Sequence, residues 1–131
     1  MLAFVAGIAA IVLGVNNSPA HTISQHYYDA IKSQDYAQAY AHLDQKMTLT
    51  LQGQEQQLNG PLFPQVAQAY DQTKGKVSDY RITGIQISSS TDSGNIAETT
   101  VKVTRNATSY DVHLRLKQEG DDWKIVSFDS L

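Results

Sequence analysis

The stretch that decides the fold is AETTVKVTRNATSYDVHLRL, residues 97–116. If Asn106 and Ala107 form a two-residue turn, the two halves of this stretch lie antiparallel and each residue faces a neighbour across the turn. One face of the hairpin is then apolar. Its pairs are Val103 with Tyr110, Val101 with Val112, Thr99 with Leu114 and Ala97 with Leu116.

The other face of the same hairpin carries charged and polar pairs. These pairs are Lys102 with Asp111, Glu98 with Arg115 and Thr100 with His113. Opposite charges on neighbouring strands stabilise a pairing, and a slip of one residue would destroy both faces at once. The sequence therefore predicts a long antiparallel hairpin with one buried face and one solvated face.

Length and composition exclude several classes of protein. The chain has 131 residues and no cysteine. This length suits one domain with a core large enough to be stable without a disulfide. Thiolate metal sites, redox motifs and a lipid-modified cysteine are excluded. The net charge of −3 and the pI of about 5.7 argue against a nucleic-acid partner, which would need clustered Lys and Arg.

Residues 1–15 are all apolar or glycine, and no Lys or Arg precedes Lys32. As a helix they would reach about 22 Å, short of the roughly 30 Å hydrocarbon core of a bilayer. They form a signal-peptide core or a shortened membrane anchor; a third interpretation, a buried core helix, is disfavoured by Gly7, Gly14 and the all-round apolar surface. Ser18 and Ala20 suit signal cleavage, but Ser18 as N-cap and Pro19 as first helical residue make a preferred helix start, which we favour. We divide the chain into an anchor or signal segment, residues 1–17, and a domain, residues 18–131.

The hydrophobic period is helical from residue 18 to residue 75 and predicts three helices. Their core-facing residues are expected to be Ile23, Tyr27, Ala30 and Ile31 in the first, Ala37, Tyr40 and Leu43 in the second, and Phe63, Val66 and Tyr70 in the third. The second helix begins after Asp35, and the third runs from Pro61 to a left-handed cap at Gly75. Between them, residues 47–51 alternate as a short strand and the Gln-rich residues 52–57 indicate a loop.

From Lys76 onward the period is two, and a phase change at Gly84 predicts a β-bulge there. The last strand is expected to place Trp123 and Ile125 on the core face, paired with Leu116 and Leu114. The predicted fold class is α+β. An N-terminal apolar helix, the anchor, precedes three helices packed on a curved, mainly four-stranded antiparallel sheet, with a short strand after the second helix.

Three stretches carry a resemblance to a known family: YYDAIKSQDYAQAYAHLD (residues 27–44), KGKV (residues 74–77) and DDWKIVSFDSL (residues 121–131). In this order they resemble small members of the nuclear-transport-factor-2-like superfamily over residues 18–131. Within it the chain is similar to bacterial membrane-anchored lumazine-binding-like domains of unknown activity. The resemblance implies a cone in which the sheet wraps the first helix and leaves a pocket at the open end.

The superfamily includes enzymes as well as binding domains, so the fold does not settle the function. The resemblance implies that isomerases and cyclases of this kind use a pocket carboxylate or His as base and a Tyr as donor. Tyr27 or Tyr28 would be that donor here. In ketosteroid-isomerase-like members the base lies on the strand after the second helix, but that strand reads MTLTL, residues 47–51, with no acid and no His.

Other candidate acid and base pairs are expected on the surface. His42 and Asp44 lie at a solvated helix end, and Asp111 and His113 lie on the solvated face of the hairpin. The spacing of five between His21 and His26 does not stack two metal ligands on one helical face. We therefore predict no catalytic residue, no metal site and no cofactor.

The ligand-pocket candidates are aromatic residues at core positions, namely Tyr27, Tyr40, Tyr70, Tyr80, Tyr110 and Trp123. They line a pocket for a small apolar ligand, or they fill the core with their hydroxyls at its rim. The interface candidates are His113, Val126 and Phe128, which are expected on the outer sheet face, where a homodimer would form. The alternative is a bulge near Ser127 that turns Phe128 into the core.

We interpret the chain as a non-catalytic extracytoplasmic domain that binds a small apolar ligand or a protein partner. It is expected at the cell membrane, held by a single pass through residues 1–15, or secreted after signal cleavage. The alternative is a small pocket enzyme of the isomerase or cyclase type that uses Tyr with a carboxylate or His.

Overall fold

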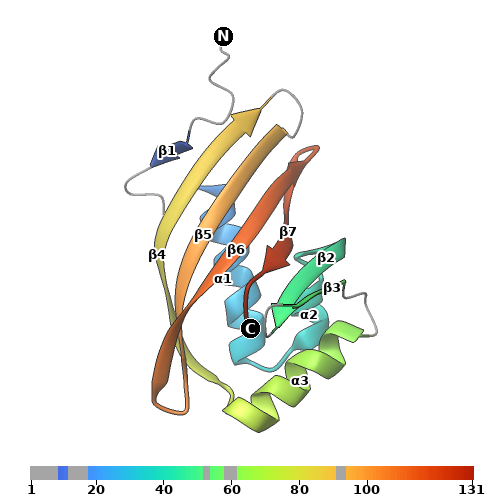
Figure 1. Ribbon diagram of the computed structural model, residues 1–131, viewed down its shortest axis with the longest axis vertical. Coiled ribbons are helices and arrows are strands. Elements are labelled where there is room, and N and C mark those ends of the chain that lie inside the picture. Colours follow the sequence, from blue (N-terminus) through green and yellow to red (C-terminus); the bar gives the residue numbers. More distant parts are fainter. Residues whose placement is uncertain (1–8, 12–17, 52–53, 58–61, 91–93) are drawn as a thin grey trace.

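The computed structural model describes residues 9–11, 18–51, 54–57, 62–90 and 94–131. It is an α+β fold in which the long strands β4, β5 and β6 curve across α1, while α2 and α3 lie at the lower end of the sheet (Figure 1). The helices are α1 (Pro19–Lys32), α2 (Tyr36–Tyr40) and α3 (Leu62–Lys74). The strands are β1 (Ala9–Ile11), β2 (Leu43–Leu51), β3 (Gln54–Gln57), β4 (Val77–Ser90), β5 (Gly94–Arg105), β6 (Thr108–Glu119) and β7 (Asp122–Phe128).

The sheet has seven strands in the order β1-β4-β5-β6-β7-β2-β3, whereas four and one short strand after the second helix were expected. That short strand, expected at residues 47–51, is β2 and begins earlier, at Leu43. The predicted meander β4 to β7 is its centre, and β2 extends it by running parallel to β7. The Gln-rich segment expected to be a loop forms β3, which pairs with β2 at the edge of the sheet. Its Gln54, Glu55 and Gln57 are all exposed, so this edge strand has no alternating apolar pattern from which it could be predicted.

The N-terminal segment differs from the expected apolar helix where the structure describes it. Residues Ala9–Ile11 form β1 and pair antiparallel with β4, Ala10 lying opposite Ile87. A short apolar run suits a strand as well as a helix, and here the free edge of β4 decides for the strand. In the described part of the chain, no helix is long and apolar enough to cross a membrane. The rest of the predicted anchor, residues 1–8 and 12–17, lies outside the described residues.

The start of α1 is as predicted. Ser18 caps it, its Oγ accepts a hydrogen bond from the His21 backbone N–H at 3.1 Å, and Pro19 is the first helical residue. The helix buries Tyr27, Ala30 and Ile31, as expected, and also Tyr28. Tyr27 and Tyr28 pack edge to face with ring centroids 4.8 Å apart, which places two large aromatic rings at the centre of the core.

The second and third helices follow the prediction with two corrections. One is that Leu43, expected on the second helix, is the first residue of β2. Asp35 caps α2, but Ala39 is buried and Ala37, expected inside, is exposed, since a helix of five residues has only one turn with which to choose its inner side. In α3, Phe63 is buried as predicted. Pro61, the expected first residue of α3, lies outside the described residues, and Gly75 follows the helix with φ +89°.

The hairpin of β5 and β6 has the predicted register in all seven pairs. Asn106 and Ala107 form its turn with φ of 50° and 65°, the left-handed conformation that two-residue hairpin turns require. The Glu98 carboxylate and the Arg115 guanidinium form an ion pair of 3.0 Å on the solvated face. The register between β4 and β5 shifts from Ile82 to Gly84, so the bulge at Gly84 is confirmed as well.

The last strand corrects the sequence prediction. Ile125 lies opposite Leu116, and Trp123 lies opposite Gln118. A bulge then adds one residue to β7 between Ile125 and Ser127, which places Phe128 opposite Leu114 on the core face. Phe128 is only 2% exposed and lies 5.3 Å from Tyr27 between ring centroids. It was therefore wrong to expect its side chain on the outer face, and the alternative with a bulge near Ser127 holds.

This position of Phe128 predicts a large loss of stability on truncation. Phe128→Ala should lower the free energy of unfolding by about 3–5 kcal/mol, because it removes a buried ring and leaves a cavity against Tyr27. Val126→Ala, at the half-buried bulge position, is the matched control and should cost about 1 kcal/mol or less. Urea unfolding followed by far-ultraviolet circular dichroism measures both. Equal costs for the two variants would contradict the buried position of Phe128.

Candidate functional site

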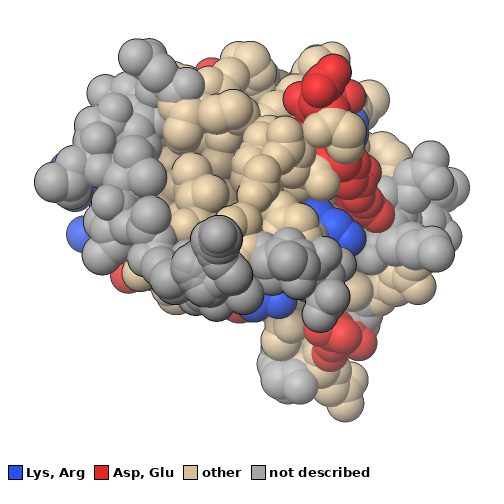
Figure 2. Space-filling model, turned by 90° about the horizontal axis from the view of Figure 1, so that it is seen from above, with Lys and Arg blue, Asp and Glu red and all other residues tan. Residues whose placement is uncertain are grey.

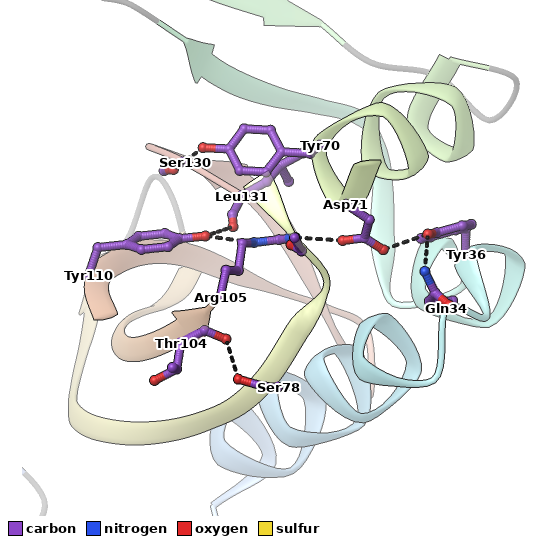
Figure 3. Close-up of polar contacts among 11 residues, drawn as sticks. Gln34, Tyr36, Tyr70, Asp71, Ser78, Thr104, Arg105, Tyr110, Ser130 and Leu131 are labelled. Carbon is purple, nitrogen blue, oxygen red and sulfur yellow. Dashed lines mark hydrogen bonds and ion pairs between the residues drawn. The ribbon is translucent and has the colours of Figure 1, made fainter. Parts of the chain in front are cut away.

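Two charged residues lie on core-facing positions at the lower end of the fold. Arg105 ends β5 on the face that buries Ala97, Thr99, Val101 and Val103. Asp71 lies on the face of α3 that also buries Phe63 and Ala67. Arg105 is 3% exposed and Asp71 is 6% exposed. Their Nη1 and Oδ1 atoms form an ion pair of 2.5 Å (Figure 3).

Arg105 is held by further acceptors. Its Nη1 also donates to the Gly75 carbonyl at 2.7 Å, and its Nε donates to the Tyr110 hydroxyl at 2.8 Å. The guanidinium carbon lies 4.9 Å from the centroid of the Tyr70 ring, which is cation–π distance. Gly75 is required here, since a Cβ at its positive φ would lie 3.0 Å from the Asn106 Cβ. Four separate contacts therefore fix the orientation of the guanidinium.

Asp71 is held on its other oxygen. The Tyr36 hydroxyl, at the start of α2, donates to Asp71 Oδ2 at 2.5 Å. Burial, with the hydrogen bond to Asp71, raises the pKa of Tyr36 to about 12, so this hydroxyl is a neutral donor at physiological pH. Both carboxylate oxygens of Asp71 are engaged. The contact joins α2 to α3, as the ion pair joins α3 to β5.

The residues that follow β7 complete this network (Figure 3). The Tyr110 hydroxyl donates to the Leu131 carbonyl at 2.9 Å, and the Tyr70 hydroxyl lies 3.3 Å from the Ser130 Oγ. The Leu131 side chain is buried. The network thus ties the segment after β7 against α3 and the β5–β6 hairpin.

A cavity of about 410 Å³ opens beside this network, between the end of α3 and the β5–β6 turn. Its lining residues are Tyr70, Thr73, Lys74, Arg105, Asn106, Thr108 and Tyr110. The volume falls within the range of small-molecule sites. Among these described lining residues two are cations, Lys74 and Arg105, and none is an Asp or Glu. We call this site the Arg105 cavity.

The structure brings two of the six predicted pocket residues to this cavity, Tyr70 and Tyr110. Tyr27 belongs to the core, where burial raises its pKa. Tyr40 packs against Phe63 with ring centroids 5.9 Å apart. The remaining two candidates are likewise placed elsewhere.

Tyr80 lies on β4 beside α1. Its ring stacks on Tyr28 at 5.4 Å, and its hydroxyl donates to Asp29 Oδ1 at 2.6 Å. Burial is the main cause of the raised pKa of Tyr80, followed by the hydrogen bond to Asp29. Trp123 is a buried residue of β7. Neither is among the residues that line the Arg105 cavity.

Histidine side chains form two other polar contacts. On the outer sheet face, His113 Nδ1 lies 2.6 Å from Asp129 Oδ2, so Asp129 rather than Asp111 is its partner. These side chains are 61% and 46% exposed and line a polar groove of about 640 Å³ with the Glu98–Arg115 pair. Because both side chains are exposed, solvent strongly screens the attraction between His113 and Asp129.

The second contact joins α1 to the end of α2. The rings of His26 and His42 are 5.6 Å apart between centroids, and burial, with His26 and Lys124 nearby, lowers the pKa of His42. Within the described ranges, no three His, Cys, Asp or Glu side chains are grouped so that they could hold a metal ion. His21 is the N3 residue of α1 and takes part in its cap.

The charged side chains are dispersed over the face of the molecule that is seen from above. Figure 2 shows Asp and Glu in a short band and in a separate cluster on the face seen from above, and Lys and Arg in small separate patches. A phosphate backbone would need a continuous basic surface. This face has no such surface among its described residues.

The sequence reasoning missed Arg105, Asp71 and Lys74, although a signal for two of them was present. Arg105 continues the alternation of the buried face of β5, and Asp71 lies eight residues after Phe63 on the inner side of α3. A single charge of each sign at a core-facing position indicates a buried pair. Lys74 is exposed and carried no such signal.

No protein-family model matches the chain, and no curated protein matches it. Solved structures do. A protein of unknown function with a cystatin-like fold from Nostoc punctiforme matches with a TM-score of 0.69 and 10% identity over 92% of each chain. A candidate ketosteroid isomerase from Shewanella frigidimarina matches with a TM-score of 0.63 and 17% identity over 88% of this chain and 96% of that chain.

An NTF2-like protein of unknown function from Shewanella oneidensis matches with a TM-score of 0.60 and 12% identity, over 85% of this chain and 94% of that chain. Identities this low show the fold alone. The fold is the NTF2-like, cystatin-like cone, and the resemblance seen in the sequence is confirmed at that level.

The buried pair predicts strong coupling between its two members. Asp71→Leu should lower the free energy of unfolding by about 3–5 kcal/mol, because it leaves the Arg105 guanidinium buried without its counter-charge. Arg105→Met in the same chain should recover most of this loss, since two apolar side chains of similar volume replace two charges. Urea unfolding of the single and double variants measures the coupling. Additive losses would contradict the pair.

The raised pKa of Tyr36 predicts a loss of stability at high pH. The folded pKa of about 12 lies above the ordinary value of 10.0, so the folded state holds this proton more tightly than the unfolded state. The resulting stabilisation is complete below pH 10 and declines as the pH rises from 10 to 12. Tyr36→Phe should make unfolding free energy less dependent on pH in that window. An unchanged dependence would contradict the Tyr36–Asp71 contact.

Proposed function

We propose that this chain is a non-catalytic, extracytoplasmic domain that binds a small ligand in the Arg105 cavity. The observation that carries the proposal is that a buried cation, Arg105, is held in a fixed orientation in the wall of the cavity. Arg105 is buried, fixed by four contacts and present in the cavity wall. A fixed cation beside the aromatic rings of Tyr70 and Tyr110 is typical of a recognition site, in which a few placed polar groups orient a ligand against apolar walls.

The same contacts argue against acid–base catalysis at this site. A general base must lie within hydrogen-bonding reach of the substrate. The carboxylate of Asp71 is engaged by Arg105 on one oxygen and by Tyr36 on the other, and it does not line the cavity. The His113–Asp129 pair lies on the outer sheet face, largely exposed to solvent.

A pocket enzyme of the isomerase or cyclase type remains the second candidate because of one contact. A buried carboxylate within hydrogen-bonding reach of a Tyr hydroxyl, here Asp71 and Tyr36 at 2.5 Å, is the arrangement that such enzymes use. One protein of similar fold is a candidate ketosteroid isomerase. For catalysis, however, Asp71 would have to leave Arg105, which would leave the guanidinium buried and unpaired.

The extracytoplasmic location rests on the apolar run of residues 1–15. A run of this kind suits a signal segment or a membrane anchor. A signal segment, or an anchor whose N-terminus stays in the cytoplasm, would carry residues 18–131 across the membrane. Protease digestion of intact cells followed by detection of the domain tests the location. A domain that is degraded only after the cells are lysed would contradict it.

Two measurements on the full chain in mild detergent distinguish ligand binding from catalysis. Benzyl alcohol, benzamide and benzoate, added at millimolar concentration to the nitrogen-15-labelled protein, should shift the amide resonances of Thr73, Lys74, Asn106 and Thr108. The isomerisation of 5-androstene-3,17-dione should stay at its uncatalysed rate. If no probe shifts these resonances, ligand binding in the cavity is wrong. If the steroid is converted and Asp71→Asn abolishes the conversion, the enzyme is the better interpretation.

A further inference from the structure

The three residues that follow β7 lead from the outer sheet face into the interior. They belong to no helix or strand. Asp129 is exposed on the outer face beside His113, whereas Leu131 is 3% exposed and belongs to the core. Ser130 lies between them and is half-buried. We call residues 129–131 the strap.

The strap engages the hydroxyls of both tyrosines that line the Arg105 cavity (Figure 3). The Leu131 carbonyl accepts a hydrogen bond from the Tyr110 hydroxyl at 2.9 Å, and the Ser130 Oγ lies 3.3 Å from the Tyr70 hydroxyl. A phenol has one proton to donate. The Tyr110 oxygen already accepts from Arg105 Nε, so Tyr110 has no donor left for a ligand while Leu131 is in place.

The strap is held mainly at its first residue. Asp129 Oδ1 accepts from the His113 backbone N–H at 2.8 Å, and Asp129 Oδ2 lies 2.6 Å from His113 Nδ1. The Asp129 N–H donates to the His113 carbonyl at 3.3 Å. Beyond Asp129, the strap forms hydrogen bonds with only the two tyrosine hydroxyls among the residues that the structure describes. A segment with so few contacts opens at a lower cost than the whole domain unfolds.

We infer that the strap competes with the ligand of the Arg105 cavity. When the strap is in place, it occupies the hydroxyls of Tyr70 and Tyr110. When it leaves, both hydroxyls become available to a ligand, and the space of the Leu131 side chain becomes accessible. Release of the strap and binding of a ligand that uses Tyr110 therefore favour each other. The inference rests on the proposed function, because it assumes a ligand in this cavity, and it adds how that site is regulated.

Opening of the strap can be followed with a single thiol, because the chain has no cysteine. Leu131→Cys places the thiol at the buried end of the strap, where a water-soluble maleimide reaches it only after opening. Adding Asp129→Ala should raise the labelling rate about fivefold, which corresponds to the loss of about 1 kcal/mol of hydrogen bonding. Adding Asp111→Ala is the matched control. Asp111 is exposed and faces Lys102, so the labelling rate should not change.

A second thiol separates opening of the strap from unfolding of the domain. Ala97→Cys places it at a fully buried position of β5. In the Ala97→Cys chain, neither Asp129→Ala nor Asp111→Ala should change the labelling rate, because the strap does not cover this position.

Competition is tested with benzamide, whose carbonyl can accept the Tyr110 proton in place of the Leu131 carbonyl. Nuclear magnetic resonance titrations use the full chain in mild detergent without an added cysteine. Asp129→Ala should bind benzamide about fivefold more tightly than the unchanged chain, because a larger fraction of the protein has the strap released. Asp111→Ala should bind it like the unchanged chain. In the Leu131→Cys chain, benzamide above its dissociation constant should increase the labelling rate.

The outcomes distinguish the inference from the proposed function. Equal labelling of the Leu131→Cys chain with Asp129→Ala and with Asp111→Ala would overturn the strap, as would faster labelling of the Ala97→Cys chain with Asp129→Ala. Slower labelling in benzamide, or equal affinity of all variants for it, would overturn the competition and leave ligand binding in place. If benzamide shifts no resonance of the cavity residues in any variant, the proposed function is rejected together with the inference.

Discussion

The ion pair between Arg105 and Asp71 is the contact on which the lower end of the molecule depends. Removing two charges from water costs several kcal/mol per ion, and their attraction offsets that cost only when the remaining donors and acceptors are also engaged. Here they are engaged from three sides. Tyr36 donates to Asp71, and Tyr110 and Gly75 accept from Arg105. The pair therefore specifies how α2, α3 and the β5–β6 hairpin must meet, more than it adds stability.

This requirement explains the local backbone around the pair. The Gly75 carbonyl reaches Arg105 because the chain leaves α3 in the left-handed conformation, and the close approach of Asn106 excludes any side chain at that position. Asn106 is itself part of the two-residue turn that ends the hairpin. A helix end and a hairpin turn, separated in sequence by all of β4 and β5, are thus fitted to one guanidinium, and the cavity lies where they meet.

Large aromatic side chains fill the core above the ion pair, and this limits where a ligand could bind. Tyr27, Tyr28, Phe63 and Phe128 are almost fully buried between the helices and the sheet. The bulge in β7 contributes to this, because it turns Phe128 inward where simple alternation would place it in solvent. Large aromatic rings fill the interior, so the proposed ligand site lies at the rim, where Tyr70 and Tyr110 lie beside the fixed guanidinium of Arg105. The fold is shared with proteins of varied function, so the site, and not the fold, supports the proposal.

The sequence by itself determined the features that depend on neighbouring residues or on one repeating pattern. The register of the β5–β6 hairpin follows from its turn and from two faces of opposite character, and the start of α1 follows from Ser18 and Pro19. The bulge at Gly84 follows from a change of phase. Each of these is fixed by interactions within or between adjacent elements, where sequence spacing translates directly into distance.

Only the tertiary structure decided which distant elements meet. The edge strands β1 and β3 form because the free edges of β4 and β2 accept them, whatever pattern their own residues show. The extra residue in β7 is placed by the packing of Phe128 against Tyr27. The sequence put one charge of each sign on two inner faces, but Asp71 and Arg105 are 34 residues apart. Whether they meet depends on the packing of α3 against the sheet, which no local pattern encodes.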